Sequence, residues 1–386
     1  MVHIFISYSK FDRLLAGELK IAFEELEGFT CFVAHDDIIP GSEWEKEILD
    51  NLDKANFFMP LQTEHLIKSH WCQQEAGISL NKGIEIVPLI PDSAGVDPIG
   101  FYAKYQGCKI KREAVKDSVE KLAKTYLLLN KEKALKKMKV RNAQHELDKQ
   151  EALAHNSRKF DEFKNELNSK KVFLLSATPI PLVDDIIDVD RDGIQQIMCN
   201  PKSYSRPNGW HMGFESENNS LTPFLEGIEK KSSHRSLKIF RNGYLEFRSS
   251  VDYNFSHAQE DEEYQKLPRF NPYVIIEYPV SFIRLFKELV SELGLPASVV
   301  LRMAYLDCGK YELGQYSPEA IGHRPGKTAT IDNIVVEKII DELDEATDIE
   351  ALMLVQRIYN AFGYTRDKIL FFNEKNIFEL PKNRKY

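Results

Sequence analysis

The first 90 residues alternate short apolar segments with longer amphipathic segments, and this alternation constrains the fold more than any other feature of the chain. Four short apolar segments have the character of buried strands: residues 3–8, 29–34, 56–61 and 84–90. Three segments between them carry apolar side chains at helical spacing: residues 11–27, 44–55 and 71–82. Strands that alternate with helices of this length form a parallel sheet with helices on both faces. The sequence therefore predicts an α/β domain with a doubly wound parallel sheet.

A long helical segment follows this domain. Residues 111–168 are rich in Lys, Glu, Leu, Ala and Gln and contain neither proline nor glycine, which is the composition of a stable helix. We expect the last helix of the first domain here, followed by a connecting helix or a helical hairpin. A chain of 386 residues is longer than one hydrophobic core usually serves. The predicted parts are residues 1–128, a helical connector at 129–169, and a second domain at 170–386.

The second domain has a mixed pattern that predicts an α+β fold. Expected strands lie at residues 172–175, 237–240, 244–248 and 273–278. Expected helices lie at residues 280–293, 297–305, 331–343 and 348–362. Arg241-Asn242-Gly243 separates two of the expected strands and is a strong hairpin signal.

Basic and aromatic residues of the second domain suggest one candidate interface. A phosphate-binding patch would be formed by Arg235, Lys238, Arg241, Arg248 and Arg284. Bases would stack on Trp210, Tyr244 and Phe247. The alternative is scattered surface charge with aromatic residues in the core, and the domain contains no recognisable nucleic-acid motif.

Composition excludes several classes of protein. The net charge of −8 argues against coating nucleic acid by bulk charge, although residues 109–171 carry 18 Lys/Arg against 10 Asp/Glu. The five cysteines are scattered without a CxxC pair, so we expect neither a zinc site nor a disulfide framework. No apolar run approaches the ~20 residues of a membrane span, and the N-terminus has no signal-peptide pattern. These features together predict a cytoplasmic protein without a metal site or a membrane anchor.

Glu75 is the leading candidate for a catalytic residue. It follows Trp71 by one helical turn, about sixty residues after the first strand. Ligands of doubly wound sheets bind outside the carboxyl ends of the strands. The loops after residues 5–7 and 32–34 belong to that edge, as does the start of the helix that carries Glu75. The pattern therefore places a carboxylate near the expected ligand cleft.

Five segments of this region, in order, make the first ~125 residues resemble a Toll/interleukin-1 receptor (TIR) domain, especially the bacterial enzymatic branch. They are Phe5-Ile6-Ser7-Tyr8-Ser9, the loop Asp37-Ile38-Ile39-Pro40-Gly41-Ser42, Trp44, the segment Ser69-His70-Trp71-Cys72-Gln73-Gln74-Glu75, and Ile86-Val87-Pro88-Leu89-Ile90. The resemblance implies a flavodoxin-like fold. It also implies cleavage of NAD+ between nicotinamide and ribose, with NAD+ as the substrate and no separate cofactor.

The resemblance also implies roles for individual residues. Glu75 matches the catalytic glutamate of the enzymatic branch, and Trp71 its aromatic neighbour. Residues 36–43 form a pocket wall and a TIR–TIR contact, so a homo-oligomer is expected. The predicted substrate-binding set is Phe5, Ser7, Tyr8, Asp36, Asp37, Ser42, Trp44 and Trp71. Many enzymatic relatives carry an acidic residue at the end of the second strand, where this chain has Ala34-His35, and Asp36 or Asp37 would take that place.

Two-domain bacterial TIR proteins commonly join the enzyme to a sensor, which predicts a C-terminal domain that responds to a nucleotide, nucleic-acid or protein trigger in anti-phage immunity. Two alternatives stay open: a non-enzymatic scaffold that binds other TIR domains, and a TIR enzyme that acts on another nucleotide.

ATP hydrolysis is rejected. The segment Gly322-His323-Arg324-Pro325-Gly326-Lys327-Thr328 resembles a phosphate-binding loop, but Ile321 stands where that loop requires glycine.

Overall fold

The chain divides into two compact units, Met1–His145 and Glu146–Tyr386. The computed structural model describes the following residues: 1–33, 44–92, 102, 104–166, 172–189, 192–199, 221–232, 235–250, 269–270, 272–309, 311–314, 326–344 and 346–380. Within these ranges no helix is both long and apolar enough to cross a membrane. The boundaries predicted at residues 128 and 169 stay predictions.

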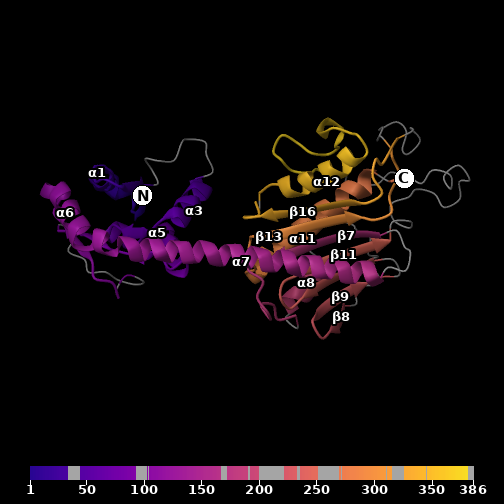
Figure 1. Cartoon of the computed structure of the whole chain (residues 1–386), viewed down its shortest axis with the longest axis horizontal. Coiled ribbons are helices and arrows are strands. Elements are labelled where there is room, and N and C mark those ends of the chain that lie inside the picture. Colours follow the sequence, from indigo (N-terminus) through magenta and orange to yellow (C-terminus); the bar gives the residue numbers. More distant parts are fainter. Residues whose placement is uncertain are drawn as a thin grey trace, which may run out of the picture. The chain divides into compact units, whose positions relative to one another are not determined.

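The first unit, which begins with the indigo end of the chain in Figure 1, is built on a parallel sheet in the strand order β2-β1-β3-β4. Its strands are β1 (Val2–Ser7), β2 (Phe29–Val33), β3 (Phe57–Pro60) and β4 (Glu85–Ile86). Its helices are α1 (Arg13–Glu24), α3 (Trp44–Lys54), α4 (Glu64–Ile67), α5 (His70–Asn81) and α6 (Val115–Leu122). Separate apolar clusters cover the two faces of the sheet. The predicted flavodoxin-like, doubly wound α/β fold is confirmed.

Alternation along the strands divides their side chains between these two faces. Ile4 and Ile6 of β1 pack with α1 and α6, whereas Phe5 packs with α3 and α5. The same alternation in β3 places Met59 with the first cluster and Phe58 with the second. Both faces are apolar because helices cover both, which explains the nearly continuous apolar character of the strands.

The strand expected over residues 84–90 is wrong as a single element. It is divided into β4 and β5 (Leu89–Pro91), and β5 pairs in parallel with β6 (Cys108–Ile110). Pro88 lies at the division and has no N–H group to donate to a ladder. A parallel bridge between Leu61 and Leu89 nevertheless continues the sheet beyond the proline.

The segment 111–168 is helical, as predicted. Helix α6 leads through a π-helical turn (Ala123–Leu127) into α7 (Leu128–Glu166) without an intervening loop. Of the two expected arrangements, α7 is therefore the connecting helix and not a helical hairpin. Side chains 142–147 of α7 are all exposed, and the division between the two units falls inside this stretch.

The second unit is built on an antiparallel sheet in the order β16-β13-β7-β11-β10-β9-β8. Its strands are β7 (Val172–Pro179), β8 (Leu221–Phe224), β9 (Gly227–Lys231), β10 (Arg235–Phe240), β11 (Leu245–Ser250), β13 (Val299–Tyr305) and β16 (Ile334–Ile340). The largest apolar cluster lies between one face of this sheet and three helices: α8 (Asp192–Cys199), α11 (Pro272–Leu293) and α12 (Ile349–Ala361). A small second sheet contains β12 (Arg269–Phe270), β14 (Glu312–Leu313) and β15 (Lys327–Thr328). An α+β unit is therefore confirmed.

Three element predictions in this unit are wrong. Residues 273–278 belong to helix α11, which continues through Pro279, because an apolar run does not distinguish a buried helix from a strand. Residues 297–305 contain β13, a central strand that is buried along its whole length and shows no period-2 alternation. Residues 331–343 contain the edge strand β16. By contrast, the hairpin at Arg241–Gly243 is confirmed: β10 and β11 pair across it, and Gly243 has φ +81°.

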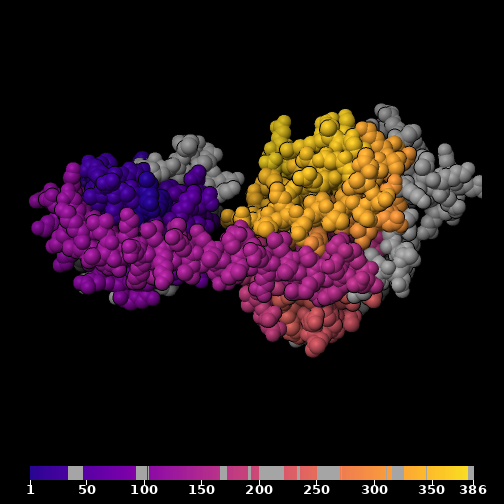
Figure 2. All heavy atoms as spheres, in the orientation of Figure 1, coloured from indigo at the N-terminus to yellow at the C-terminus, as the bar shows by residue number. Residues whose placement is uncertain are grey.

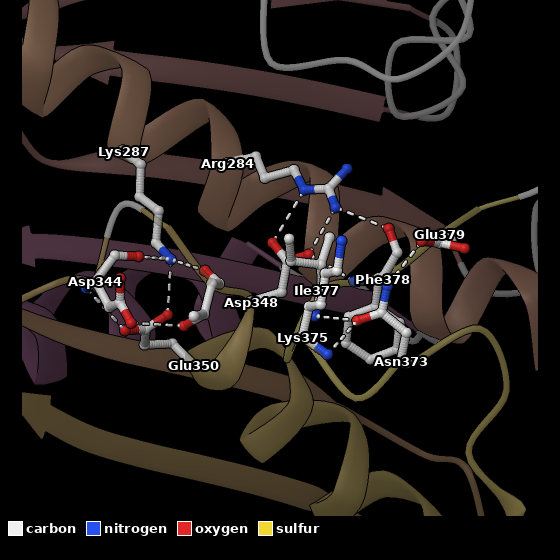
Figure 3. A network of polar contacts seen from close by, with 11 residues as sticks. Arg284, Lys287, Asp344, Asp348, Glu350, Asn373, Lys375, Ile377, Phe378 and Glu379 are labelled. Atoms are coloured by element: carbon white, nitrogen blue, oxygen red, sulfur yellow. Dashed lines mark hydrogen bonds and ion pairs between the residues drawn. The ribbon is translucent and has the colours of Figure 1, made fainter. Parts of the chain in front are cut away.

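Charged groups join the C-terminal segment to the helices of this unit (Figure 3). Arg284 of α11 donates to both carboxylate oxygens of Asp348, at 3.0 and 2.6 Å, and to the backbone oxygen of Phe378. Lys287, one turn later, donates to Glu350 and to the carbonyls of Asp344 and Thr347. Charges this deeply buried are retained because each has several partners.

The other face of the large sheet is covered by residues of α7 from the second unit. Phe163 packs on Leu174 and Ala304, and Ala152 packs on Ile180 and Val300. The outer side of this part of α7 is exposed in the space-filling view (Figure 2). The second unit therefore has three layers: α7, the sheet, and the helices α8, α11 and α12.

Candidate functional site

Glu75 and Ser7 meet at the carboxyl edge of the parallel sheet. Ser7 is the last residue of β1, and its hydroxyl donates a hydrogen bond to Oε2 of Glu75 on α5. The two residues are 68 positions apart in the sequence. Both are buried, with 1% and 4% of their surface exposed. The fold therefore places a carboxylate and a hydroxyl together where doubly wound sheets bind ligands.

Helix α5 is held in position by contacts around its first turns. The side chain of Ser69 caps the helix by accepting from the Cys72 amide at 3.4 Å. The Cys72 thiol donates to the Tyr8 carbonyl at 3.4 Å, and the Tyr102 hydroxyl donates to the Cys72 carbonyl at 3.3 Å. The bond to Tyr8 joins α5 to the residue after β1, and the bond from Tyr102 holds the same turn from a distant segment, so the start of the helix that carries Glu75 is held by two separate parts of the chain.

Burial makes Glu75 an unusual carboxylate. Desolvation raises its pKa to about 7, and hydrogen bonds from the side chains of Ser7 and Trp71 oppose this rise. The group is thus close to half ionised at neutral pH. A buried carboxyl with a pKa near the working pH, held by a defined donor, is a recognised mark of a functional site.

Cys72 has a different character. Burial, with a further contribution from the charge of Glu75, raises the pKa of its thiol to about 11. It therefore stays protonated at neutral pH and serves as a small buried residue beside the site. A thiol of this kind is structural and not a nucleophile.

The aromatic residues of the predicted substrate-binding set occupy different environments. Phe5 is fully buried between Phe32 and Phe58, with ring centroids 5.2 and 5.7 Å away. Tyr8 lies in the apolar cluster on the opposite face of the sheet from Phe5. Trp71 is partly exposed and packs at the border of the cluster formed by α3 and α5. Of these three rings, Trp71 is the one that combines exposure with proximity to Glu75.

Four other predicted residues cannot be placed in the site. Asp36, Asp37 and Ser42 lie outside the described residues, and of Trp44 only the backbone, at the start of α3, is described. Their roles stay predictions. Within the described residues, no group of three or more His, Cys, Asp or Glu side chains is arranged to hold a metal ion.

Sequence reasoning missed Gln62, which lies two residues beyond the end of β3. This side chain has no exposed surface, and neither its Oε1 nor its Nε2 has a hydrogen-bond partner. The available signal was a polar residue immediately after an apolar strand, at the edge where ligands bind.

Two members of the candidate phosphate patch of the second unit are paired with carboxylates, and the patch itself stays a prediction. Arg284 is bound to Asp348, and Arg248 pairs with Glu246. Tyr244 and Phe247 are buried, with 1% and 0% of their surface exposed. Trp210 lies outside the described residues. The core-aromatic alternative describes Tyr244 and Phe247 correctly.

Comparison with known proteins assigns the first unit. The family model described as TIR domain matches residues 4–124. A structural neighbour is the TIR domain of the Toll-related receptor TRR-2 from Hydra magnipapillata, at 19% identity and a TM-score of 0.27, covering 31% of this chain and 91% of that one. Another is the structure of the activated Roq1 resistosome directly recognizing the pathogen effector XopQ (TIR domains), at 19% identity and a TM-score of 0.23, covering 36% and 81%. Comparison with curated proteins returned no match.

Proposed function

Because residues 4–124 of this chain are a TIR domain, we propose that the protein is an NAD+ glycohydrolase that uses Glu75 as its catalytic carboxylate. The observation that carries the proposal is the buried Glu75 carboxylate, bound by Ser7 at the carboxyl edge of the sheet. A protein that used this unit only as a scaffold would gain nothing from a desolvated carboxylate with a pKa near 7.

The chemistry of NAD+ cleavage suits such a group. The bond between C1′ of the ribose and N1 of the pyridinium breaks, and its electron pair neutralises the leaving nicotinamide, so no strong general acid is needed. Positive charge develops on the ribose as an oxocarbenium-like state. The ionised Glu75 carboxylate stabilises that charge in a poorly hydrated site, where electrostatic interactions are strong. Because the interaction strengthens in the transition state, it accelerates the reaction.

The reaction is completed at C1′ of the ribose. A water molecule adds there and loses a proton, which yields ADP-ribose; attack by a group of the same nucleotide instead gives a cyclic isomer. Ser7 is a positioning residue, because its bond directs one carboxylate oxygen. Trp71 is proposed as the aromatic surface beside the nicotinamide. The proposal includes self-association through the TIR domain and activation through the C-terminal unit in prokaryotic anti-phage immunity.

The test is the nucleotide pool of cells that express the full chain, measured by mass spectrometry with and without phage challenge. We expect NAD+ to fall, with nicotinamide and an ADP-ribose product appearing. The isosteric Glu75→Gln variant should lower turnover roughly 10²- to 10³-fold. Glu64→Gln is the matched control, because Glu64 of α4 is exposed.

Two results would contradict the proposal. Wild-type NAD+ turnover by Glu75→Gln would remove Glu75 from the chemistry. Unchanged NAD+ under a challenge that still produces a protein-dependent phenotype would favour a TIR scaffold, or, if another nucleotide were consumed, a different substrate.

A further inference from the structure

Gln62 lies at the carboxyl edge of the parallel sheet, the edge at which Glu75 is placed. The polar atoms of its buried side-chain amide have no protein partner. No part of its surface is exposed, and neither Oε1 nor Nε2 makes a hydrogen bond. A buried amide without partners is unfavourable, and native proteins retain very few. Such a group points to a ligand that completes its bonds.

The backbone fixes where Gln62 lies. The backbone N–H of Gln62 donates to the Leu89 carbonyl at 2.8 Å, and the backbone N–H of Leu61 donates to the Ser7 carbonyl at 2.8 Å. Ser7 itself is aligned with Pro60 in the parallel ladder. Gln62 is thus two residues beyond the partner of Ser7, an advance of roughly 7 Å along an extended strand.

Strand alternation decides which face of the sheet Gln62 belongs to. Met59 and Leu61 pack in the cluster with α1 and α6, whereas Phe58 packs in the cluster with α3 and α5. Because the bridge to Leu89 continues the strand through Leu61, Gln62 belongs to the face of Phe58. Ser7 belongs to that face too, since its neighbour Phe5 does, and Glu75 is bound to Ser7.

We infer that Gln62 recognises the carboxamide of the nicotinamide ring and so makes the site specific for the amide form of the dinucleotide. This inference rests on the proposed cleavage of NAD+. A primary carboxamide offers one acceptor and two donors, which complement the Oε1 and Nε2 of a glutamine side chain. When the ribose of NAD+ lies at Glu75, the carboxamide of the nicotinamide is separated from the ribose by the width of one pyridine ring. The distance along the sheet from Ser7 to Gln62 is of the same size.

The consequence is discrimination between dinucleotides that differ in one group. Nicotinic acid adenine dinucleotide has a carboxylate in place of the carboxamide, so it lacks the N–H donors and adds a charge. A site built to hydrogen-bond a substrate group rejects the analogue that lacks it, because the buried protein groups are then left unpaired. We expect the wild-type protein to favour NAD+ by about 100-fold in kcat/KM.

The experiment compares kcat/KM for the two dinucleotides in concentrated full-length protein and two variants. Gln62→Leu should lower kcat/KM for NAD+ by about 30- to 100-fold and change kcat/KM for the analogue little, so that the preference for NAD+ falls to within about 3-fold of equality. Gln62→Glu should keep the preference, because a carboxylate accepts from the amide and repels the carboxylate of the analogue. Gln74→Leu, on the exposed side of α5, is the matched control and should behave as wild type. Thermal unfolding checks that each variant is folded.

The outcomes separate the two proposals. Wild-type cleavage of NAD+ with an unchanged preference in Gln62→Leu would overturn the role of Gln62 and leave the proposed function intact. If Gln62→Leu does not fold, the Gln62→Glu variant decides: loss of its preference for NAD+ would overturn the role of Gln62. Absence of both NAD+ cleavage and NAD+ binding in the wild-type protein would overturn both.

Discussion

At the scale of single residues, the site depends on how far Glu75 is removed from water. An exposed glutamate on a helix would ionise well below neutral pH. Burial on α5 raises the pKa of Glu75 to about 7, and the hydroxyl of Ser7 stabilises the ionised form. The carboxylate therefore costs stability when ionised, which is a common property of catalytic groups.

The first prediction concerns pH. Between the unfolded pKa of 4.5 and the folded pKa of about 7, the folded state holds the proton more tightly than the unfolded state. Wild-type stability should therefore fall as pH rises through this window. Glu75→Gln should be more stable than wild type by up to about 3 kcal/mol at pH 8, with little difference at pH 4.

Chemical denaturation of both proteins at pH 4, 6 and 8 checks this prediction. A stability difference that does not change with pH would show that the Glu75 carboxyl is not desolvated as described. Since the proposed mechanism uses the ionised carboxylate, wild-type kcat/KM for NAD+ should rise with pH through about 7.

At the scale of elements, α7 is attached to the sheet of the second unit by a buried polar cluster. Arg302 of β13 donates to the Asn156 carbonyl at 2.8 Å and to the Ser157 hydroxyl at 3.1 Å, and it pairs with Glu337. Its guanidinium also lies 4.8 Å from the ring centroid of Phe160. Arg302 thus joins three residues of the helix to the two neighbouring strands β13 and β16.

We expect Arg302→Met to destabilise the second unit by about 2–4 kcal/mol, because the carbonyl of the buried Asn156 loses a donor that burial makes hard to replace. Urea unfolding measures the change. Lys338→Met is the control, since Lys338 is exposed on the adjacent strand and should change stability by less than about 0.5 kcal/mol. Equal effects of the two substitutions would mean that the cluster contributes nothing specific.

Elements were predicted well wherever periodicity was unambiguous. The helices α1, α3 and α5 and the strands β1 to β3 of the first unit match the expected segments closely. Mistakes occur in both units: the strand expected over residues 84–90 is divided, and three elements of the second unit were assigned to the wrong type, two of which are buried. In α11, residues 273–276 read Tyr-Val-Ile-Ile and lie in the core. Burial on all sides removes the polar face that would have revealed the helical period.

At the scale of the whole molecule, one helix belongs to both units. Helix α7 begins in the first unit, where Lys133 and Lys137 pair with Glu85, and ends in the second. Over residues 142–147 every side chain is exposed, so this stretch keeps its helical form without packing against a core. A helix that is exposed on all sides is held by its own backbone bonds and side-chain pairs.

We therefore expect Ala143→Pro to break α7 without unfolding either unit. Proline removes a backbone hydrogen bond and clashes with the preceding turn, at about 3 kcal/mol. Limited proteolysis near residue 143 should be accelerated about 10- to 100-fold and should leave two resistant fragments. Ala143→Ser is the control and should be cleaved at the wild-type rate. If Ala143→Pro became sensitive to the protease throughout the chain, the two units would not be independent.

The sequence by itself determined the α/β architecture of the first unit, the long helix and the place of Glu75 on a helix of that unit, because these follow from periodicity, composition and local motifs along the chain. It could not determine that Ser7 would bind Glu75 across 68 residues, or that Gln62 would be buried on the same face. It also left open whether Phe5 would line a cleft or fill the core. Those outcomes depend on which strands become neighbours and which face of the sheet each helix covers. Only the tertiary structure decides them, since burial, and with it the pKa of Glu75, arises from groups that are distant in the chain.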